Sequence, residues 1–347
     1  MYLHVDMDYF YAQVEEKRRP MAKGKIVVVC MYSGRTPDSG AVATVNYLGR
    51  EIGIKAGMPI MLAKKRAPPA DSIFVPADRE YYALISAQID EIIRKIFKRV
   101  VQSSIDEWNI EDETAENAPK IKEIIKKELD LTCTVGVAPS PLGAKMAASK
   151  AKPDGLLILN DQTEKKLIED SDLEKVPGIG PKTAEALREF GVNKVGELKN
   201  VDPMALVETF GKKSGGWLHS LATGNYPKEL GEEKEQEEVS RYGTLKEKTR
   251  DMNMMINKID ELEKDAREWI MHMKKSFRTF TIMFITEDMK VHSKSMSFKN
   301  PMPWNADTNE EEKALIAEFL QENHLYIRRI GIRFGNFMDL SGQTTLF

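Results

Sequence analysis

The chain has 347 residues, of which 41% are hydrophobic and 30% charged, and a formal net charge of −3. This composition is typical of a soluble globular protein, and the length predicts two to four domains. No run of about 18 apolar residues occurs, so we expect no membrane-spanning helix. The small net charge also means that a nucleic-acid partner would have to be held by local basic surfaces, not by a field over the whole molecule.

The two cysteines both lie in apolar, strand-like runs. Cys30 ends the run IVVVC, and Cys133 lies in LTCTVGV. Such residues are typical of buried reduced thiols and not of a disulfide framework. The N-terminus begins with the strand-like MYLHVD instead of a basic segment followed by an apolar one, so we expect no signal peptide. Together these features predict a cytoplasmic protein.

The first 160 residues alternate strand and helix patterns, which predicts a mixed α/β domain with an inserted segment at roughly 11–77. Residues 78–98 predict an amphipathic helix, because isoleucines recur there at helical spacing. We expect further helices starting near Asp8, at 116–129 and at 142–150. The expected strands are 2–6, 25–32, 100–106, 107–112, 131–137 and 155–159.

The predicted secondary structure changes twice in the rest of the chain. Residues 161–226 predict short helices, and residues 228–238 predict a solvated linker, because nothing in that acidic run could bury a face. The last hundred residues predict elements in the order β-α-β-β-α-β, a small sheet with two helices on one face. The patterns as a whole therefore predict a multidomain α+β protein.

The last expected strand has two different faces. Ile330, Ile332 and Phe334 alternate with residues that include Arg329 and Arg333. Because alternate residues of a strand point to opposite sides, the apolar set should pack on the helices and the arginines should lie on the other face. That face is either simply solvated or contacts phosphate groups.

Three acidic residues lie at expected strand ends. Asp6 ends an apolar strand, and Asp106 and Glu107 join two others. Carboxylates at the ends of adjacent strands can converge on hard divalent cations, and two such ions can activate a hydroxyl and stabilise a leaving pyrophosphate. A single strand-end acid is more often an ordinary exposed residue. The chemistry therefore depends on the sequence around these acids.

Five segments around and beyond these acids carry specific motifs. They are VDMDYFYAQVEE (5–16), SGAVATVNYLGREIGIKAGMPI (39–60), SSIDEWNI (103–110), TVGVAPSPLGAKMAASKAKPDG (134–155) and VPGIGPKTAEAL (176–187). In order and spacing, over essentially the whole chain, the sequence resembles the Y-family DNA polymerases of the archaeal and bacterial lesion-bypass branch. The resemblance implies a template-directed DNA polymerase of low fidelity that performs translesion synthesis and lacks proofreading.

The resemblance also implies a division into domains. The implied parts are a palm at 1–10 and 77–160, fingers at 11–76, a helical thumb at 161–226, a linker at 227–238, a little finger at 239–338 and a tail at 339–347.

For the metal site, the resemblance implies oxygen ligands. Asp6, Asp106 and Glu107 match the family's metal ligands, and the backbone carbonyl of Met7 would also lie on a metal ion. Asp8 matches the second acid of the same motif, which is not expected to bind metal directly. The implied cofactor is a pair of Mg²⁺ ions, for which Mn²⁺ can substitute.

For the nucleotide site, Tyr11 matches the steric gate, an aromatic ring that would clash with a ribose 2′-hydroxyl. Tyr9 and Phe10 match its aromatic neighbours around the sugar. Arginine offers a forked donor to phosphate oxygens and lysine a compact charge. The residues that match the triphosphate-binding groups are Thr44, Tyr47, Arg50 and Lys152. Tyr47 and Arg50 are three residues apart on an expected helix. Without the resemblance, they could simply lie on an exposed face of that helix.

Ala41, Ala43 and Gly57 match small fingers residues around the nascent base pair, which implies an open site that tolerates distorted bases. The sequence departs from the family's usual pattern after the acidic dipeptide. There it has Trp108 and Asn109, where the family more commonly has Ala and an aromatic residue, and we expect Trp108 to pack beside the palm sheet.

The segment VPGIGPKTAEAL independently predicts a helix-hairpin-helix. Gly178 and Gly180 would make a tight turn and leave the amides of the second helix free to meet a DNA phosphate. The alternative is a plain turn between two packed helices.

The C-terminal hexapeptide resembles peptides that dock into the hydrophobic pocket of a sliding clamp. Its matching residues are Gln343, Leu346 and Phe347. A disordered tail is the ordinary alternative for a chain terminus.

The histidines show no metal-binding spacing, so a zinc site or a histidine-centred triad has no support. They are His4, His219, His272, His292 and His324.

Three functional classes can be compared. The first is the polymerase, with primer-template DNA, dNTPs and a sliding clamp as partners, expected to be a monomer with no membrane contact. The second is another two-metal nucleotidyl enzyme of cyclase type, which would need no grip on DNA. The third is a non-catalytic DNA-binding adaptor. It predicts the loss of at least one of Asp6, Asp106 and Glu107, and all three are present.

Overall fold

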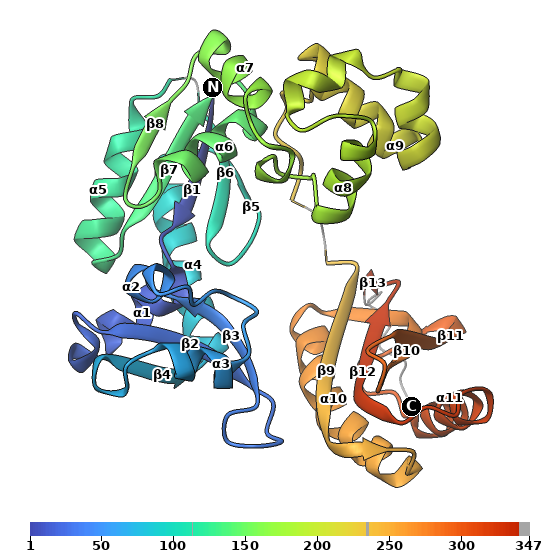
Figure 1. The fold of residues 1–347 in the computed structure, drawn as a ribbon. Helices are drawn as coiled ribbons and strands as arrows, with labels where there is room; N and C mark the ends of the chain where they lie inside the picture. Colours follow the sequence, from blue (N-terminus) through green and yellow to red (C-terminus); the bar gives the residue numbers. More distant parts are fainter. Residues whose placement is uncertain (113, 234–235, 340–347) are drawn as a thin grey trace. The chain divides into compact units, whose positions relative to one another are not determined.

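The computed structural model describes residues 1–112, 114–233 and 236–339. The chain divides into two compact units, and Figure 1 traces them along the sequence. The first unit comprises residues 1–30, 42–57 and 64–233, and the second contains the remaining described residues. Within the described part of the chain, no helix combines the length and the apolar character needed to cross a membrane.

A five-stranded sheet with the order β5-β6-β1-β7-β8 forms the centre of the first unit (Figure 1). The central strand β1 pairs antiparallel with both β6 and β7, whereas β7 and β8 run parallel. The bounds are Tyr2–Met7 (β1), Arg99–Gln102 (β5), Glu107–Glu111 (β6), Cys133–Ala138 (β7) and Leu156–Ile158 (β8). These strands confirm the mixed α/β character expected for the first 160 residues.

Three helices contribute residues to the core on one face of this sheet. They are α1 (Phe10–Arg18), α4 (Arg79–Ile96) and α5 (Asn117–Leu129). Leu3, Val5 and Met7 of β1 belong to the core on this face, together with isoleucines of α4 and α5. Because successive residues of a strand alternate, His4 and Asp6 point to the opposite face.

That opposite face carries helix α6 (Pro141–Ala151), which approaches the sheet at Gly136 of β7. A Cβ atom on Gly136 would lie 2.0 Å from the carbonyl oxygen of Ala144 and 2.3 Å from the amide nitrogen of Ala148. The register pairs Gly136 with His4, whose side chain is fully buried. The absence of a side chain at Gly136 therefore lets α6 lie close against the sheet beside His4.

Replacing Gly136 with Ala should destabilise the protein by at least about 1–3 kcal/mol, because the new methyl group meets backbone atoms that cannot rotate away. Chemical denaturation of the variant measures the effect. Gly216→Ala is the matched control, since its Cβ would meet nothing within 4 Å. Equal free energies of unfolding for the two variants would show that α6 does not pack as described.

A three-stranded sheet with the order β3-β2-β4 lies in the segment that was expected as an insertion, and β2 and β4 run parallel. Its strands are β2 (Ile26–Tyr32), β3 (Gly40–Val45) and β4 (Ser72–Pro76), with helices α2 (Tyr47–Glu51) and α3 (Ile60–Arg66) and the 3₁₀-helices Pro20–Ala22 and Pro69–Asp71. Cys30 of β2 and Cys133 of β7 are both buried, and neither is part of a disulfide, as the sequence predicts.

Residues 161–226 are helical, as expected. The helices are α7 (Asp161–Glu169), α8 (Pro181–Glu189) and α9 (Pro203–Thr223), with the 3₁₀-helices Leu173–Lys175 and Val195–Asn200. They enclose a core of their own that includes Leu173, Leu187 and Leu218.

In the run 228–238, expected as a solvated linker, every described residue except Leu230 is exposed. Leu230 is buried, and Arg99 of β5 donates a hydrogen bond to its carbonyl oxygen at 3.2 Å. Glu233 forms an ion pair with Arg94 of α4. The sequence does not reveal this burial, because a single buried apolar side chain leaves no periodic pattern. Arg94 and Arg99, which contact this segment, are also far away in the sequence.

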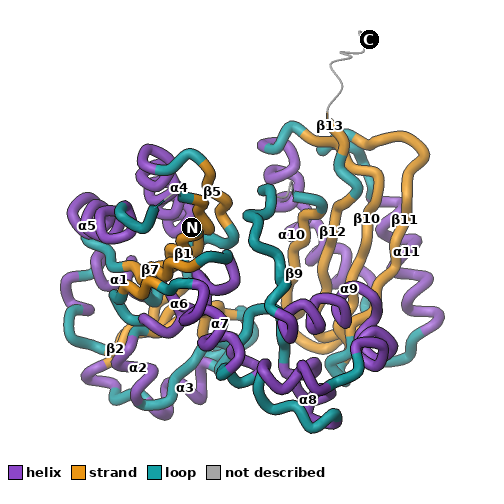
Figure 2. Tube along the Cα trace, turned by 90° about the horizontal axis from the view of Figure 1, so that it is seen from above, coloured by secondary structure: helices purple, strands orange, loops and turns teal. Residues whose placement is uncertain are grey.

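The second unit contains a sheet with the order β11-β10-β12-β9, whose strands Figure 2 shows side by side. Its elements are β9 (Glu238–Thr249), α10 (Met252–His272), β10 (Lys275–Thr286), β11 (Val291–Met302), α11 (Asn309–Glu322), β12 (Ile327–Gly335) and the short β13 (Met338–Asp339), which pairs with β10. The order of the first six confirms the β-α-β-β-α-β prediction. Apolar residues of both helices share one core with Ile330, Ile332 and Phe334 of β12.

The buried carboxyl group of Glu312 and the half-buried one of Glu263 connect the two helices of this unit. Glu312 of α11 accepts a hydrogen bond from Thr308 at 2.9 Å, and Thr308 also contacts Glu263 of α10 at 3.1 Å. Arg267 forms an ion pair with Glu263. Burial, reinforced by the neighbouring charge of Glu263, raises the pKa of Glu312 from 4.5 to about 8.

This raised pKa predicts a pH-dependent stability. The folded state holds the proton of Glu312 more tightly than the unfolded chain, so the stabilisation is complete below pH 4.5 and is lost as the pH rises towards 8. The expected slope is at most about 1.4 kcal/mol per pH unit. Glu312→Gln should flatten the profile and make the protein more stable than wild type at alkaline pH.

Urea denaturation between pH 5 and 9 measures this profile. Glu310→Gln on the exposed side of the same helix is the control and should keep the wild-type slope. A wild-type profile that is flat, or that rises with pH, would contradict the assignment.

Candidate active site

The three predicted metal ligands lie where β1 and β6 meet. The register pairs Asp6 with Glu107, and the amide of Met7 donates to the carbonyl oxygen of Asp106 at 2.9 Å. The carboxylate of Asp106 accepts a hydrogen bond from Ser104 at 2.7 Å. The sheet therefore brings together acids that are about a hundred residues apart in the sequence.

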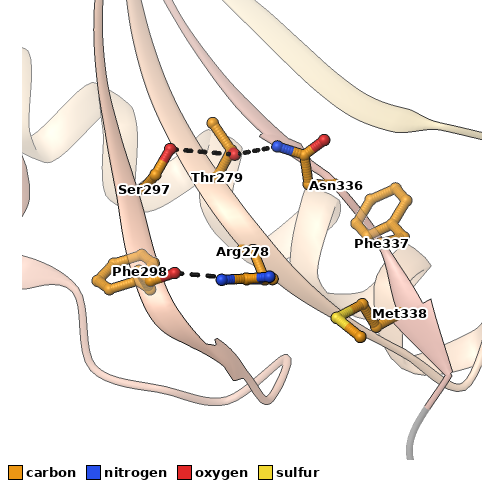
Figure 3. A pocket seen from close by; sticks show the side chains of 7 residues that line it. All are labelled: Arg278, Thr279, Ser297, Phe298, Asn336, Phe337 and Met338. Atoms are coloured by element: carbon orange, nitrogen blue, oxygen red, sulfur yellow. Dashed lines mark hydrogen bonds between the residues drawn. The ribbon is translucent and has the colours of Figure 1, made fainter.

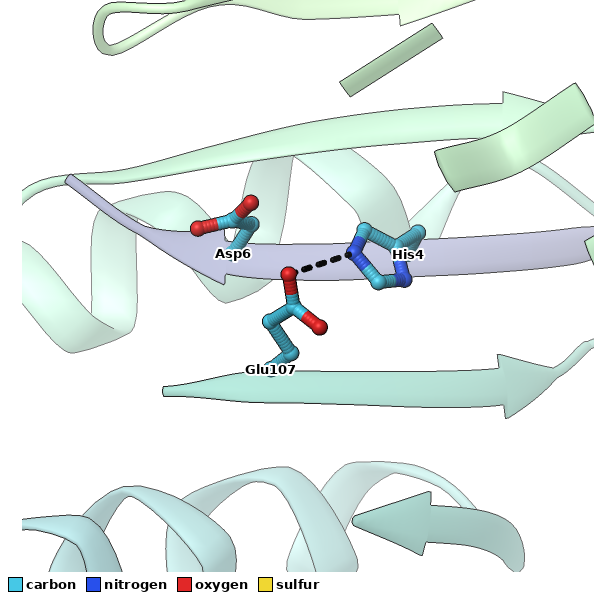
Figure 4. A group of neighbouring side chains, drawn as sticks. All are labelled: His4, Asp6 and Glu107. Carbon is cyan, nitrogen blue, oxygen red and sulfur yellow. Dashed lines mark ion pairs between the residues drawn. The ribbon is translucent and has the colours of Figure 1, made fainter. Parts of the chain in front are cut away.

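Within this region, the side chains whose ligand atoms all lie within 4.8 Å of one another are His4, Asp6 and Glu107 (Figure 4). Figure 4 shows Asp6 and His4 on β1 and Glu107 reaching towards them from the neighbouring strand. Asp106 is not a member of this group. The sequence predicted Asp6 and Glu107 here but not His4.

Two lysines neutralise these carboxylates. Lys152 Nζ lies 2.6 Å from Asp6 Oδ1, and Lys145 Nζ lies 2.7 Å from Glu107 Oε2. Lys152 was predicted, as a phosphate-binding residue, and it directly follows α6. Lys145 was missed, although it lies seven residues earlier, about two helical turns away. That spacing is the signal that could have pointed to it.

The carboxylates differ in their protonation. Burial raises the pKa of Asp6 to about 6, against the opposing effect of Lys152. Burial alone would also raise the pKa of Glu107, but the hydrogen bond from Lys145 and the neighbouring His4 bring it below its usual value. Both groups are therefore mainly ionised near neutral pH and available as oxygen donors.

Asp8 occupies a separate, buried position. It accepts hydrogen bonds from Thr134 at 2.8 Å and from the amide of Asp154 at 2.9 Å. These contacts attach the end of β1 to β7 and to the segment after α6, while Lys152 in that same segment holds Asp6. Asp8 thus helps to fix the position of Lys152 relative to Asp6.

The aromatic residues after β1 have different surroundings. Tyr9 has a left-handed backbone with φ 37°, and its hydroxyl donates to Glu16 at 3.1 Å. Phe10 is 2% exposed and belongs to the core, so its ring is turned away from any ligand. Tyr11 is half-buried and stacks on Tyr82 of α4, with ring centroids 4.3 Å apart. The sequence did not indicate this role for Tyr82.

The predicted triphosphate-binding residues of the fingers lie on β3 and α2. Thr44 is half-buried in β3, and the Arg50 guanidinium lies 5.0 Å from the centre of the Tyr47 ring. Burial, together with the nearby carboxylate of Asp8, raises the pKa of Tyr47 to about 12. The Tyr47 hydroxyl is therefore a hydrogen-bond donor near the end of β1.

Among the small fingers residues, Ala41 and Ala43 lie in β3. Gly57 has φ +81°, a conformation that favours glycine, and its amide donates to the carbonyl oxygen of Val42 at 2.9 Å. A Cβ atom on Gly57 would meet nothing within 4 Å. The need for glycine there is therefore conformational.

The predicted helix-hairpin-helix turn immediately precedes α8. Gly178 has φ +99°, and Gly180 is the N-cap of the helix without a side-chain hydrogen bond to it. Pro181 is the first helical residue. The amides at the start of α8 thus have no side-chain cap, which is the arrangement that phosphate binding requires.

The alternation predicted for the last strand is confirmed. Arg329 and Arg333 lie on the face of β12 opposite to the helices. Arg333 contacts Glu238 at 3.2 Å, whereas the buried Nε atom of Arg329 lacks a hydrogen-bond partner among the described residues.

An open hollow of 440 Å³ lies on the same unit (Figure 3). The lining of this hollow is largely polar: Thr279 contacts Ser297 at 3.5 Å and accepts a hydrogen bond from Asn336 at 2.5 Å. Arg278 donates to the carbonyl oxygens of Phe298 and Lys299, at 3.4 and 2.8 Å, which occupies part of its donor capacity.

Two further predictions have different outcomes. Trp108 lies in β6 of the five-stranded sheet, is fully buried, and donates its Nε1–H to Asp90 of α4 at 3.0 Å. The proposed clamp-docking residues Gln343, Leu346 and Phe347 lie outside the described residues.

Comparison with known proteins gives a consistent result. The impB/mucB/samB family model matches residues 5–149, its C-terminal domain model matches 236–346, and a model described as pathogenicity locus matches 168–220. A DNA polymerase IV of Methanosarcina acetivorans is 36% identical over 99% of this chain and 98% of its own length. One of Metallosphaera sedula is 38% identical over 98% and 97%.

Solved structures agree. The Y-family DNA polymerase chimera Dbh-Dpo4(243-245)-Dbh is 34% identical, with a TM-score of 0.89 over 97% of this chain and 99% of its own. An insertion ternary complex of Dbh DNA polymerase is 33% identical, with a TM-score of 0.69 over the same shares of the two chains. The acidic site at the junction of β1 and β6 and this similarity over the full length lead to one conclusion: the chain belongs to the Y family of translesion DNA polymerases.

Proposed function

We propose that this polymerase adds dNTPs to a primer 3′-hydroxyl by two-metal nucleotidyl transfer, with low fidelity and without proofreading. The observation that carries this proposal is the convergence of the Asp6 and Glu107 carboxylates at the junction of β1 and β6, beside Asp106. Two Mg²⁺ ions bound there would activate the hydroxyl and stabilise the leaving pyrophosphate, and Mn²⁺ can substitute for them.

The donor set fits hard divalent cations. Asp6, Asp106 and Glu107 supply carboxylate oxygens, and the carbonyl oxygen of Met7 would supply a further one. In the described structure the negative charges of Asp6 and Glu107 are compensated by lysine ammonium groups. A cation bound between the carboxylates would take over this compensation and release Lys152 for the substrate.

The incoming triphosphate would lie between α2 and the segment after α6. Arg50 would bind phosphate oxygens through its fork, Lys152 would add a compact positive charge, and the hydroxyls of Tyr47 and Thr44 would donate hydrogen bonds. The raised pKa of Tyr47 supports its role as a donor. Because the ring of Phe10 is in the core, Phe10 would act through its backbone.

The sugar would be selected by Tyr11, with Tyr9 beside it. The stack of Tyr11 on the buried Tyr82 supports this assignment, since a gate must be held in place to exclude a 2′-hydroxyl. Little side-chain bulk at Ala41, Ala43 and Gly57 would leave room for a distorted base pair, which supports low fidelity.

In this proposal the palm consists of residues 1–10 and 77–160, the fingers of 11–76, the thumb of 161–226 and the little finger of 239–338. The amides at Gly178 and Gly180 would contact DNA phosphates from the thumb, and Arg329 and Arg333 would do so from the little-finger sheet. The uncapped start of α8 and the arginine face of β12 support these contacts.

The remaining parts of the proposal concern the binding partners, the oligomeric state and the cellular location. The tail 339–347 would bind a sliding clamp through Gln343, Leu346 and Phe347, and the protein would act as a monomer in the cytoplasm. A cyclase-type enzyme and a non-catalytic adaptor are not favoured, because relatives that match along the whole length are named DNA polymerases.

Metal dependence and the absence of proofreading can be tested together on an end-labelled primer annealed to a template. With dNTPs and Mg²⁺ the primer should lengthen, chelation should stop this, and added Mg²⁺ or Mn²⁺ should restore it. Without dNTPs, a primer with a mismatched 3′-end should keep its length. Extension that persists after chelation, or a primer that shortens, would contradict the proposal.

A further inference from the structure

The acidic dipeptide, Asp106 and Glu107, lies where the loop after β5 enters β6. On one side it is attached to β1, because the amide of Met7 donates to the carbonyl oxygen of Asp106 and Glu107 pairs in register with Asp6. Groups that act together in catalysis must be held to within about half an ångström of the productive geometry. The contacts that hold the rest of this segment therefore matter for catalysis.

Helix α4 contacts the residue before the dipeptide through Ser86. Ser86 is 3% exposed, and its hydroxyl donates to the carbonyl oxygen of Ile105 at 2.6 Å. The side-chain amide of Gln102 donates to the same hydroxyl at 2.9 Å. A carbonyl oxygen only accepts, so the single hydrogen of the hydroxyl goes to Ile105 and its lone pair receives Gln102. Ser86 thus connects both ends of the loop that leads to the dipeptide.

The same helix contacts the residue after the dipeptide through Asp90. Trp108 is fully buried and donates its Nε1–H to Asp90 Oδ1 at 3.0 Å. Arg94 holds this carboxylate in turn, with its Nε atom 2.9 Å from Oδ1 and 2.8 Å from Oδ2. Residues four apart in a helix share one face, so Ser86 and Asp90 approach the β5–β6 segment from the same side.

We infer that Ser86 and Asp90 are positioning residues, which fix the acidic dipeptide for metal binding through its two flanking residues. Because Ser86 and Trp108 are buried, leaving either hydrogen bond unmade is costly, so the segment is held firmly. The second attachment needs an indole N–H, and Trp108 stands where the family more commonly has Ala. It is therefore not a general property of the family. This inference rests on the proposed role of the dipeptide in metal binding.

The first test is Ser86→Ala in the full-length protein. Alanine favours a helix and only the hydroxyl is removed, so the variant should fold. Single-turnover extension with saturating dNTP should be about 10-fold slower or more, because a small displacement of a reacting group lowers the rate steeply. The dNTP concentration at half-maximal rate should stay within about twofold of wild type, since the proposed triphosphate-binding residues are untouched.

Mn²⁺ binding provides a readout that does not depend on catalysis. The electron spin resonance signal of free Mn²⁺ measures its affinity for the protein in the absence of DNA and dNTP. Ser86→Ala and Trp108→Phe should each bind Mn²⁺ about 10-fold more weakly than wild type, because a less firmly oriented ligand binds more weakly. Trp108→Phe removes the indole N–H and keeps an aromatic ring in the core.

Two control substitutions remove the same kinds of donor in other parts of the chain. Ser171 donates to the carbonyl oxygen of Leu167 at 2.6 Å, and Trp269 donates its Nε1–H to Gln236 at 2.9 Å. Ser171→Ala and Trp269→Phe should therefore keep both the wild-type rate and the wild-type affinity for Mn²⁺.

The outcomes separate this inference from the proposed function. Folded Ser86→Ala protein with the rate and Mn²⁺ affinity of Ser171→Ala would overturn the role of Ser86, even if its stability is lower. The same equality between Trp108→Phe and Trp269→Phe would overturn the role of Asp90. If Asp106→Asn also keeps the wild-type rate, the dipeptide does not bind the catalytic metal, and the proposed function itself fails.

Discussion

Replacing Asp106 with Asn should lower the rate of nucleotide addition by about 10³-fold or more, because one anionic metal ligand is lost where charge develops in the transition state. The side chain is partly exposed, and its hydrogen bond from Ser104 can be kept by the amide oxygen of Asn. The fold and its stability should therefore change little. Single-turnover primer extension with saturating dNTP measures the rate.

Asp112→Asn is the matched control for this prediction. Asp106 precedes β6 and Asp112 follows it, so both substitutions remove one charge at an end of the same strand. Asp112 accepts a hydrogen bond from Asn117, and the whole length of β6 separates it from Asp106. Its rate should stay within a few-fold of wild type, and equal losses for the two variants would show that the effect of Asp106 is not specific.

The second large effect concerns sugar selection. Tyr11→Ala should increase the efficiency of rNTP addition by about 10- to 100-fold, since accommodating an extra atom against a fixed ring costs roughly 1–3 kcal/mol. The efficiency with dNTPs should fall only modestly, because the metal ligands are untouched. The ratio of kcat/KM for a dNTP and its matching rNTP measures the change.

Tyr81→Ala provides the comparison for Tyr11→Ala. Tyr81 is an aromatic residue of α4 next to Tyr82, but its ring lies beneath Arg18, 4.5 Å from the guanidinium. Its substitution should leave the dNTP/rNTP ratio as in wild type. If Tyr11→Ala keeps the wild-type ratio while still extending with dNTPs, Tyr11 is not the gate.

Much of this architecture follows from local patterns in the sequence. The isoleucines of α4 and the alternation in β12 are repeated over several turns or residues, so their burial can be predicted from spacing alone. The convergence of Asp6 and Glu107 can also be predicted from the sequence. Both acids lie at the ends of apolar strands, and such strands pair within one sheet, which brings their ends together. The motifs then specify which chemistry such acids perform.

Other features depend on contacts that spacing does not encode. The stack of Tyr82 on Tyr11 joins α4 to α1, and the hydroxyl of Tyr82 donates to the buried Glu15 at 2.7 Å. Leu230 is a single apolar residue in an acidic run, and its burial depends on the edge of a distant sheet. Such pairs become visible only when the chain is folded.

His4 shows the limit most directly. Histidines scattered along a sequence give no metal-binding pattern, yet His4 and Asp6 are two residues apart on one strand and so share a face. This spacing was the available signal. The contacts of His4 with Asn109 and Glu107 of β6 come from strand pairing, which brings residues about a hundred positions apart together.

The measurement that tests the central claim most directly is single-nucleotide extension of a primer on a template, undamaged or with an abasic site, with each dNTP in turn. On the undamaged template the protein should add mainly the complementary nucleotide in the presence of Mg²⁺ or Mn²⁺, and it should also continue past the lesion. No addition by the wild-type protein with either ion would contradict a polymerase function and leave a DNA-binding adaptor as the remaining explanation.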